Sequence, residues 1–460
     1  MLAAAALIAL VEPLSQLFRL VPRNYNEGWN AFWAQAATRG GALYAAPDSP
    51  IANNYPPLSF HLVGLIGRLI GDNVIAGRLV SLASFVAILG AAYLFLRETG
   101  AARRIALAGT VILCVTFAFF GQTYVAVNDP QMLAHAFMLS GLAVLFAFDF
   151  SRNAVIAGAV LILLGGFTKH LLIPLPIALT LWIAMYRREQ LVTWLACFAI
   201  GLPLGFWVIS SVYPAFVTEL LSQRAYSFHH SVSSTLHALV RFLPLIAIGA
   251  FSVIRGQRVT PRVALVLMYA VLSVGVGALA AGGEGVTRNA YFDLLIALTL
   301  FAACGLESML ERGRARVIAV LGVGVLAFAV TTVPQTVREL RELDALERDT
   351  RATVAMIQRL GGGHAACETL SLCYWARAPF TLDFFNYGRK LRTGSASVDV
   401  CEKALQSGEF PVLQLEYGRR SSPVGERLWP CTPAIHQYYT EAFRSRAGIL
   451  LVPKERLARS

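Results

Sequence analysis

Long apolar segments dominate this sequence and limit the kind of fold that it can adopt. A helix needs about 20 mostly apolar residues to cross a bilayer, and the chain holds about eleven segments of this kind. They are 2–20, 74–96, 104–121, 130–148, 154–168, 171–186, 191–212, 238–254, 263–281, 290–306 and 316–333. The sequence therefore predicts a polytopic α-helical membrane protein. The fifth and sixth segments can also be interpreted as one long broken helix.

The few charged residues divide the chain into two parts. They make up 14% of the sequence, against about 25% in soluble proteins. Residues 1–334 hold 13 of the 27 acidic residues, and residues 335–460 hold the other 14. We therefore expect a transmembrane domain over 1–334 and a small C-terminal domain over 335–460. The first ten residues lack the basic flank and the cleavage site of a signal peptide, so we expect them to begin the first membrane helix.

The C-terminal part has the pattern of a small α/β domain. Residues 337–360 carry apolar side chains at helical spacing, and three glycines end this stretch. Beyond it we expect three strands and one further helix, the strands at 365–377, 410–415 and 449–452 and the helix near 398–407.

The seven cysteines fall into two groups. Cys114, Cys197 and Cys304 lie in apolar segments, where we expect them to be small apolar fillers. The others lie in the C-terminal domain: Cys367, Cys373, Cys401 and Cys431. In an oxidising exterior compartment these four could form two disulfides, with three pairings open. A zinc site is the weaker alternative, because the spacing is irregular.

Basic residues in the short loops predict the orientation of the chain. Alternate loops hold most of the arginines, and the positive-inside rule places those loops in the cytoplasm. They are Arg97, Arg103, Arg104, Arg152, Arg187, Arg188, Arg255, Arg258, Arg262, Arg312, Arg314 and Arg316. The other loops and the C-terminal domain then face the exterior, which is the periplasm for an inner-membrane protein. These topology signals explain the net charge of +12, so we expect no nucleic-acid partner.

Two acidic residues in the exterior loops are candidates for function, because charge near the membrane is costly. Glu27 follows the first apolar segment, and Asp129 precedes a proline that opens another. Two carboxylates on one face could hold a divalent cation, Mg²⁺ or Mn²⁺, or serve as a base and its helper. The alternatives are structural: Glu27 as a charge at a helix N-terminus and Asp129 as a helix cap.

Three basic residues on the same side are candidates for phosphate binding. Lys169 lies in the turn Gly-Gly-Phe-Thr-Lys-His between two apolar segments, where a compact cation could hold a phosphate or simply belong to a polar turn. Arg78 lies at the outer end of a span, as a phosphate ligand or a snorkelling side chain. Arg288 lies in a glycine-rich exterior segment, 282–293.

The first exterior loop contains the sequence Asn-Asn-Tyr-Pro-Pro at 53–57. Two prolines end any preceding helix and allow a new one to begin. The helix that follows, about 58–70, is too short to span the membrane, so we expect it to lie along the surface or to re-enter. Tyr55 and His61 flank the prolines and are candidate substrate contacts.

Taken in order, these motifs resemble those of a known group. An acidic residue after the first span, a Tyr-Pro-Pro segment, an acidic residue before a proline and a Phe-Thr-Lys turn are similar to the C-type (GT-C) membrane glycosyltransferases. The resemblance is to the branch of the protein mannosyltransferases and the aminoarabinose transferase that modifies lipid A, and it covers most of residues 20–300. It implies an inverting enzyme that passes a hexose or pentose from a polyprenyl phosphate to a lipid, polysaccharide or protein at the exterior face.

The resemblance also implies roles for single residues. Glu27 matches the first acidic position, usually an aspartate, which implies a catalytic base or a carboxylate next to a metal. Asp129 matches the second acidic position, which implies a metal ligand or a residue that orients the acceptor. Lys169 matches the lysine that contacts the donor phosphate, and Arg78 and Arg288 match further phosphate contacts more loosely.

Other classes of membrane protein fit parts of the sequence. A transporter or flippase of lipid-linked substrates would also place charges in a helix bundle, but the two related halves that are common in transporters are missing. An acyltransferase or ligase would favour a histidine-centred site, for which the candidates are His61, His135, His170, His229 and His230. A scaffold without activity would leave the exterior carboxylates and Lys169 unexplained.

Overall fold

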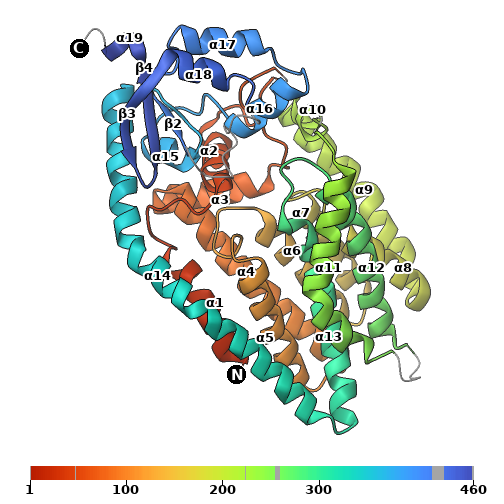
Figure 1. Ribbon diagram of the computed structural model, residues 1–460. Helices are drawn as coiled ribbons and strands as arrows, with labels where there is room; N and C mark the ends of the chain where they lie inside the picture. The colour runs from red at the N-terminus through yellow and green to blue at the C-terminus, as the bar shows by residue number, and fades with distance from the viewer. Residues whose placement is uncertain (1, 47, 223, 254–258, 417–428, 458–460) are drawn as a thin grey trace.

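The computed structural model places a helix at each predicted apolar segment (Figure 1). It describes residues 2–46, 48–222, 224–253, 259–416 and 429–457. The helices are α1 (Leu2–Ser15), α4 (Asn73–Glu98), α5 (Arg103–Phe120), α6 (Gln131–Ala147), α7 (Arg152–Gly166), α8 (Pro174–Tyr186), α9 (Arg188–Val212), α11 (Phe228–Ala250), α12 (Pro261–Ala281), α13 (Phe292–Glu311) and α14 (Ala315–Gly361). The chain turns between α7 and α8, so this region forms two helices.

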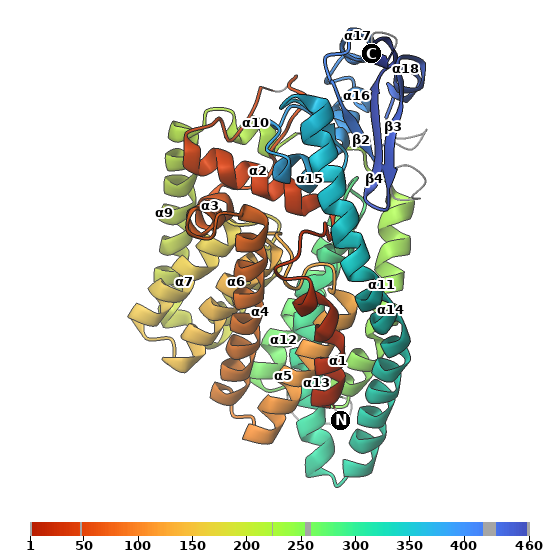
Figure 2. The ribbon, with the colours of Figure 1, turned by 90° about the vertical axis from the view of Figure 1, so that its left-hand side faces the viewer.

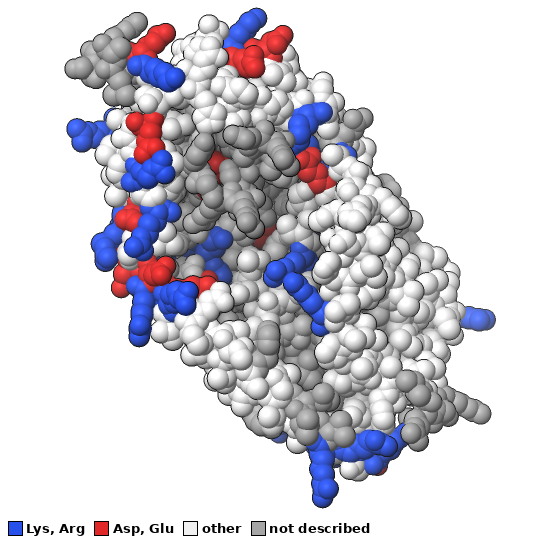
Figure 3. Space-filling view, viewed as in Figure 1, with Lys and Arg blue, Asp and Glu red and all other residues white. Residues whose placement is uncertain are grey.

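The bundle is built to lie in a membrane. Within the described ranges, six helices are long and apolar enough to cross one: α4, α5, α9, α11, α12 and the segment that ends with α13. Shorter apolar helices, among them α6, α7 and α8, pack beside them. On the face shown in Figure 3, the surface between the charged upper part and the charged lower end is mainly uncharged. The predicted fold class, a polytopic helical membrane protein, is confirmed.

Helix α14 connects the bundle to the C-terminal part. It has 47 residues and rises along the side of the molecule to the small sheet (Figures 1 and 2). It passes through Pro334 without a break, although proline removes one helical hydrogen bond. The expected boundary near Pro334 therefore lies inside a helix that serves both parts, and the division into two domains stays a prediction.

Two short helices lie across one end of the bundle, beneath the C-terminal part (Figures 1 and 2). They are α2 (Tyr25–Arg39) and α3 (Leu58–Ile70), and Pro57 immediately precedes α3. The prediction of a short helix after the two prolines is confirmed. This end also carries the loops that hold the predicted site residues.

The arginine-rich loops gather at the opposite end. Arg187 pairs with Asp149, and Arg262 donates to the backbone oxygen of Thr99, so contacts join neighbouring loops. Arg312 lies 5.6 Å from the ring centre of Phe251 in a third contact. Two arginines of the predicted set, Arg255 and Arg258, lie outside the described residues.

The C-terminal part contains a four-stranded mixed sheet in the order β1-β2-β4-β3. Its strands are β1 (Ala366–Cys367), β2 (Leu413–Leu415), β3 (Tyr439–Ser445) and β4 (Gly448–Pro453). Strands β1 and β2 are parallel, and the other two pairs are antiparallel. Its helices are α15 (Leu370–Trp375), α16 (Phe384–Arg392), α17 (Val398–Gln406), α18 (Thr432–Tyr438) and α19 (Lys454–Leu457). The second and third predicted strands and the helix near 398–407 are confirmed, whereas β3 was not predicted.

The predicted strand over 365–377 is wrong beyond its first residues. The chain leaves the sheet after Cys367 and forms α15, which packs against α2. The contact is so close that a Cβ atom on Gly28 would lie 2.0 Å from the backbone nitrogen of Ser371. Tertiary packing on α2 thus overrides the strand propensity of this apolar run.

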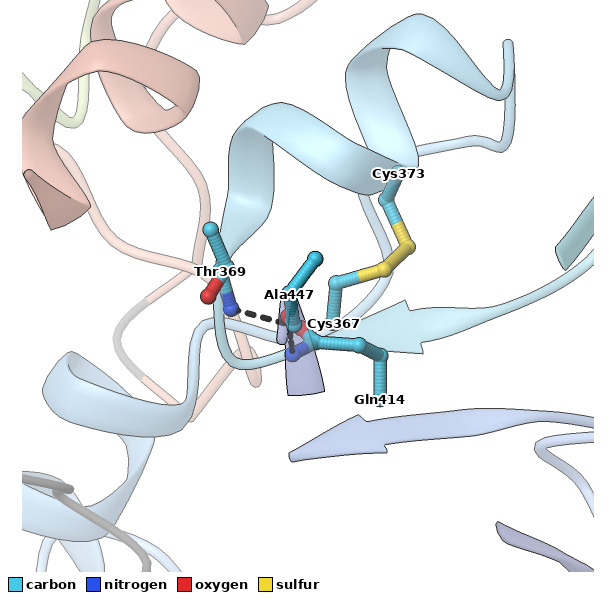
Figure 4. The surroundings of a disulfide bond; sticks show 5 residues. All are labelled: Cys367, Thr369, Cys373, Gln414 and Ala447. Carbon is cyan, nitrogen blue, oxygen red and sulfur yellow. Dashed lines mark hydrogen bonds between the residues drawn. A yellow bond between two sulfur atoms is a disulfide. The ribbon is translucent and has the colours of Figure 1, made fainter. Parts of the chain in front are cut away.

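The four C-terminal cysteines form two disulfides, Cys367–Cys373 and Cys401–Cys431. Of the three possible pairings, the structure adopts the one that joins neighbours in the sequence. The first bond ties α15 to β1, as Figure 4 shows. The predicted disulfides are confirmed, and no group of His, Cys, Asp or Glu within the described ranges has the arrangement of a metal site.

With the C-terminal part in its predicted exterior position, we expect a membrane-impermeant maleimide to label its cysteines in intact cells only after reduction. The physical reason is that all four thiols are consumed in disulfides. The measurement is the mass shift of peptides containing Cys367 or Cys431, with and without reductant. The buried Cys304 serves as a control that stays unlabelled in both cases. Labelling of Cys367 or Cys431 without reductant would show free thiols and contradict the pairing.

Candidate active site

The first turn of α2 anchors one side of the site. Asn24 caps the helix by accepting a hydrogen bond from the backbone nitrogen of Glu27. The Glu27 carboxylate in turn accepts one from the backbone nitrogen of Arg23 over 2.9 Å. Glu27 is therefore part of the N-terminal cap of α2, as the structural interpretation of the sequence expected.

Glu27 and Arg78 form a fully buried ion pair. Nε and Nη2 of Arg78 donate to the two carboxylate oxygens of Glu27, both over 2.7 Å, and both side chains are 0% exposed. The remaining N–H groups of Arg78 donate to backbone oxygens of residues 16, 19 and 21. All five donors of the guanidinium are thus used. In this position Arg78 clamps the segment between α1 and α2 onto α4.

Asn128 fastens the loop before α6 to the same anchor. Its side-chain amide donates to the backbone oxygen of Glu27 over 3.0 Å, and its backbone oxygen accepts from Asn30 over 2.9 Å. A Cβ atom on Gly77 would lie only 1.8 Å from the Asn128 side chain, so a larger residue on α4 would displace it. These contacts fix the position of the next residue, Asp129.

Asp129 and Lys169 meet in a second buried cluster. Nζ of Lys169 lies 3.6 Å from Oδ1 of Asp129, and both side chains are at most 5% exposed. Asn26 of α2 donates to Oδ2 of Asp129 over 2.9 Å, and the backbone nitrogen of Gln131 donates to Oδ1 over 2.9 Å. The structure therefore joins the α2 motif, the Asn-Asp-Pro motif and the Phe-Thr-Lys turn.

Tyr55 and Asn289 complete the surroundings of Lys169. Nζ lies 3.5 Å from the Tyr55 hydroxyl and 4.7 Å from the centre of its ring. With its side-chain oxygen turned toward Lys169, Asn289 accepts a hydrogen bond from Nζ over 3.3 Å. We call Asp129, Lys169, Tyr55, Asn26 and Asn289 the lysine cluster.

The lysine cluster keeps Lys169 charged. Burial acts to lower the pKa of Lys169, which lies in the turn between α7 and α8, but the nearby Asp129 and Tyr55 outweigh burial and raise the pKa above its ordinary value. The ammonium contacts, 3.3 to 3.6 Å, are longer than the 2.7–2.9 Å of strong charge-assisted hydrogen bonds. A charged amine that is buried and only loosely held can bind a further anion.

In the described part of the chain, four predicted site residues make no hydrogen bond or ion pair with the lysine cluster: Glu27 and Arg78, which pair with each other, and Arg288 and His61. Arg288 is exposed at the start of a short 3₁₀ helix, η1 (Arg288–Tyr291), and its neighbour Asn289 reaches the cluster instead. His61 is half-buried, and its Nε2 lies 2.9 Å from the Tyr213 hydroxyl. Sequence reasoning missed Asn26 and Asn289, although each lies directly beside a residue that it singled out.

The residues present do not fit the expected divalent cation at Glu27. Its two oxygens already accept from Arg78, from the backbone of Arg23 and from the backbone of Asn128. Four acceptor positions are thereby filled, which leaves none to coordinate a metal. Asp129 alone is a poor site for Mg²⁺ or Mn²⁺, which prefer several oxygen ligands. We derive no step through a metal.

The C-terminal part touches α2 next to the cluster. Asp383, at the start of α16, accepts from Nε1 of Trp29 over 3.0 Å and from the Tyr25 hydroxyl. Farther along α16, Lys390 donates to the backbone oxygen of Ser49 over 3.1 Å and lies 3.4 Å from the Glu219 carboxylate. Helix α16 therefore fastens the loop between α2 and α3 next to α2.

Comparison with known proteins identifies the fold. No protein-family model and no curated protein sequence matches the chain. Among solved structures, the chain is similar to ArnT from Cupriavidus metallidurans in the apo state, with a TM-score of 0.63, 13% identity, and coverage of 98% of this chain and 97% of that chain. A second structure of that protein, bound to undecaprenyl phosphate, gives a TM-score of 0.60 at 14% identity, again with 98% and 97% covered.

The archaeal oligosaccharyltransferase AglB from Archaeoglobus fulgidus also matches, over 78% of this chain and 57% of that chain, at 13% identity and a TM-score of 0.47. That score is too low to support an argument. The ArnT match, by contrast, extends over nearly all of both chains. The protein therefore has the GT-C membrane fold of the aminoarabinose transferase ArnT, and the resemblance expected from its motifs is confirmed at the level of the fold.

Proposed function

We propose that the protein is an inverting glycosyltransferase that moves a sugar from a polyprenyl-phosphate donor to an acceptor hydroxyl at the exterior face of the membrane. The observation that carries the proposal is the buried lysine cluster at the end of an apolar helix bundle. The ArnT fold supports it, since one ArnT structure is bound to undecaprenyl phosphate. The identities of the sugar and of the acceptor are left open.

Lys169 binds the donor phosphate in this proposal. It is charged and buried, and its contacts are loose enough for a phosphate oxygen to replace one of them. Asn289 and Tyr55 hold the amine from two sides. A cation in a water-poor site stabilises the charge of a leaving phosphate more strongly than one in water does.

Asp129 is the general base. Asn26 and the backbone of Gln131 fix its carboxylate, and one of its four acceptor positions stays open beside the three contacts described above. The acceptor oxygen attacks the anomeric carbon as the bond from that carbon to the phosphate oxygen breaks. The hydroxyl proton passes to Asp129, and the polyprenyl phosphate leaves with its charge beside Lys169.

The other predicted site residues take different parts in this proposal. Glu27 and Arg78 support the site by clamping α2, because their hydrogen-bonding groups are used by each other and by the backbone. Arg288 and His61 remain candidates for contacts with substrates. Arg288 directly precedes Asn289 of the cluster, and His61 lies on α3, the helix that begins three residues after Tyr55.

The lysine cluster and the C-terminal domain face the exterior, or the periplasm, in the proposed orientation. The arginine-rich loops lie at the opposite end of the bundle, which the positive-inside rule places in the cytoplasm. The two disulfides support the same orientation, since such bonds persist in oxidising compartments. Catalysis would then occur on the side where the C-terminal domain covers α2.

We expect Lys169→Gln to weaken the binding of undecaprenyl phosphate roughly 10- to 100-fold, because a charge-assisted contact to the phosphate is lost. The measurement is native mass spectrometry of the full-length protein titrated with undecaprenyl phosphate in detergent. Lys403→Gln, an exposed change on α17, is the matched control and should bind as the wild type does.

Unchanged affinity in the Lys169→Gln protein would contradict the phosphate role. The chief alternative, a flippase of lipid-linked substrates, predicts that the protein in sealed vesicles moves a fluorescent polyprenyl-phosphate sugar across the bilayer without transferring the sugar. That result would replace the proposed function.

A further inference from the structure

A surface hollow lies on the side of α2 that faces away from the lysine cluster. It is a groove of about 1060 Å³ between α2, α14 and α15. Phe32, Gln35 and Arg39 line it, whereas Asn26 and Asn30 project from the opposite face of α2 toward the loop that holds Asp129. The groove is therefore separate from the lysine cluster. Its volume slightly exceeds the range for drug-sized ligands, roughly 300–1,000 Å³, so it has room for an oligosaccharide.

The residues that line the groove carry a net positive charge. Its lining includes Arg39, Arg351 and Arg377 against one carboxylate, Asp72. Arg351 pairs with Glu347, but within the described ranges neither Arg39 nor Arg377 has an ion-pair partner. Arginine presents a planar set of donors that fits a phosphate or a carboxylate.

Arg377 stands at an unusual backbone position. Its φ angle is +57°, a left-handed conformation that glycine adopts without strain and that other residues rarely adopt. It follows α15, the helix that the disulfide Cys367–Cys373 ties to the sheet (Figure 4). A non-glycine residue in this conformation, next to a helix fixed by a disulfide, is typical of a residue that binds a ligand.

Aromatic and polar groups suited to sugar rings line the same groove. Trp375 donates its Nε1 hydrogen to Asp72 over 3.0 Å, which fixes the indole plane, and Tyr374 stands next to it. Gln35 and Gln358 add amides. Aromatic faces pack against sugar rings, and the amides can bond to sugar hydroxyls.

We propose that this groove binds a saccharide that carries a phosphate or a carboxylate. The saccharide is the part of the acceptor remote from the hydroxyl that receives the sugar, and this assignment rests on the proposed function. Arg39 and Arg377 hold the anionic group, and Trp375 and Tyr374 contact the sugar rings. Binding energy from a remote part of a substrate positions its reacting end.

The test is calorimetric titration of the full-length protein in nanodiscs, without any donor. The probes are maltotriose, maltotriose that carries one phosphate monoester, and inorganic phosphate. The phosphorylated trisaccharide should bind at least tenfold more tightly than either other probe. Arg39→Gln and Arg377→Gln should each weaken it roughly tenfold. Arg377→Gly relaxes the backbone, so it should lose binding while keeping the fold. Arg446→Gln, an exposed change near the β3–β4 turn, is the control.

Three results would overturn the groove as an anionic saccharide site. The first is equal affinity for the charged and the neutral trisaccharide, and the second is unchanged affinity in both arginine variants. The third is no binding of either trisaccharide at 10 mM, roughly the top of a practical titration range. Each of these results leaves the proposed transfer reaction standing, because the assay contains no donor. Conversely, binding that depends on Arg39 and Arg377 in a protein that transfers no sugar would uphold the site and count only against the proposed function.

Discussion

Replacing Asp129 by asparagine is expected to lower kcat for sugar transfer by about 10²- to 10⁴-fold, the range that general-base catalysis contributes. The amide keeps the shape of the side chain, and its single oxygen can still accept from the backbone nitrogen of Gln131, but it cannot take the acceptor proton. The loss should therefore fall on kcat, with little change in the KM for the donor. The measurement is steady-state transfer with the purified full-length protein.

Asp149→Asn is the matched control for this change. Asp149 is 81% exposed in its side chain and pairs with Arg187 at the opposite end of the bundle. The control should transfer at the wild-type rate. A kcat within threefold of wild type in Asp129→Asn would show that Asp129 is not the base.

Arg78→Met is expected to lower the free energy of unfolding by about 3–5 kcal/mol, the usual effect of removing one partner from a buried ion pair. The change leaves the Glu27 carboxylate buried without its cation and leaves the backbone oxygens of residues 16, 19 and 21 without their donors. The measurement is thermal unfolding in detergent. Arg187→Met, which removes an exposed partner of Asp149, should change stability by about 0–1 kcal/mol.

The Glu27–Arg78 ion pair also makes the stability of the fold depend on pH. Burial alone would raise the pKa of Glu27, but pairing with Arg78 outweighs burial, and the pKa in the folded protein lies below the ordinary value of 4.5. The contribution of the pair is therefore present in full above pH 4.5 and is lost as the pH falls through the lower folded pKa. The wild type should lose stability over this range, and Arg78→Met should lack that part of the loss. An Arg78→Met protein as stable as the wild type would contradict the clamp.

The helices could be predicted from the sequence because their signals are local. The length of an apolar segment is set by the thickness of the bilayer, so each segment predicts its own helix. The start of α3 is also local, since Pro56 and Pro57 stop one helix and open the next. The strand expected over 365–377 failed because its structure is decided by α2, a helix more than 300 residues away in the sequence.

The sequence predicted most of the charged residues of the candidate site, but not which of them contact one another. The sequence selects the right loops, because Glu27, Asp129 and Lys169 are rare charges among apolar residues. It does not tell which cation meets which carboxylate. Arg78 and Lys169 are equivalent by sequence, yet Arg78 is saturated by Glu27 and backbone oxygens, and Lys169 is held loosely. Neutral amides such as Asn26 and Asn289 carry no such signal, and only the fold brings them to Lys169.

The most direct test of the account is sugar transfer by the purified protein in lipid, with a panel of radiolabelled polyprenyl-phosphate sugars and a cell-envelope extract as the source of acceptors. The account predicts that label from at least one donor moves to an acceptor with inverted anomeric configuration. Asp129→Asn should slow this transfer about 10²- to 10⁴-fold and Lys169→Gln at least roughly tenfold at low donor concentration. Asp149→Asn and Lys403→Gln should transfer as the wild type does. Transfer at the wild-type rate in both cluster variants would contradict the assignment of the lysine cluster as the active site of a glycosyltransferase. Absence of transfer with every donor would contradict it as well.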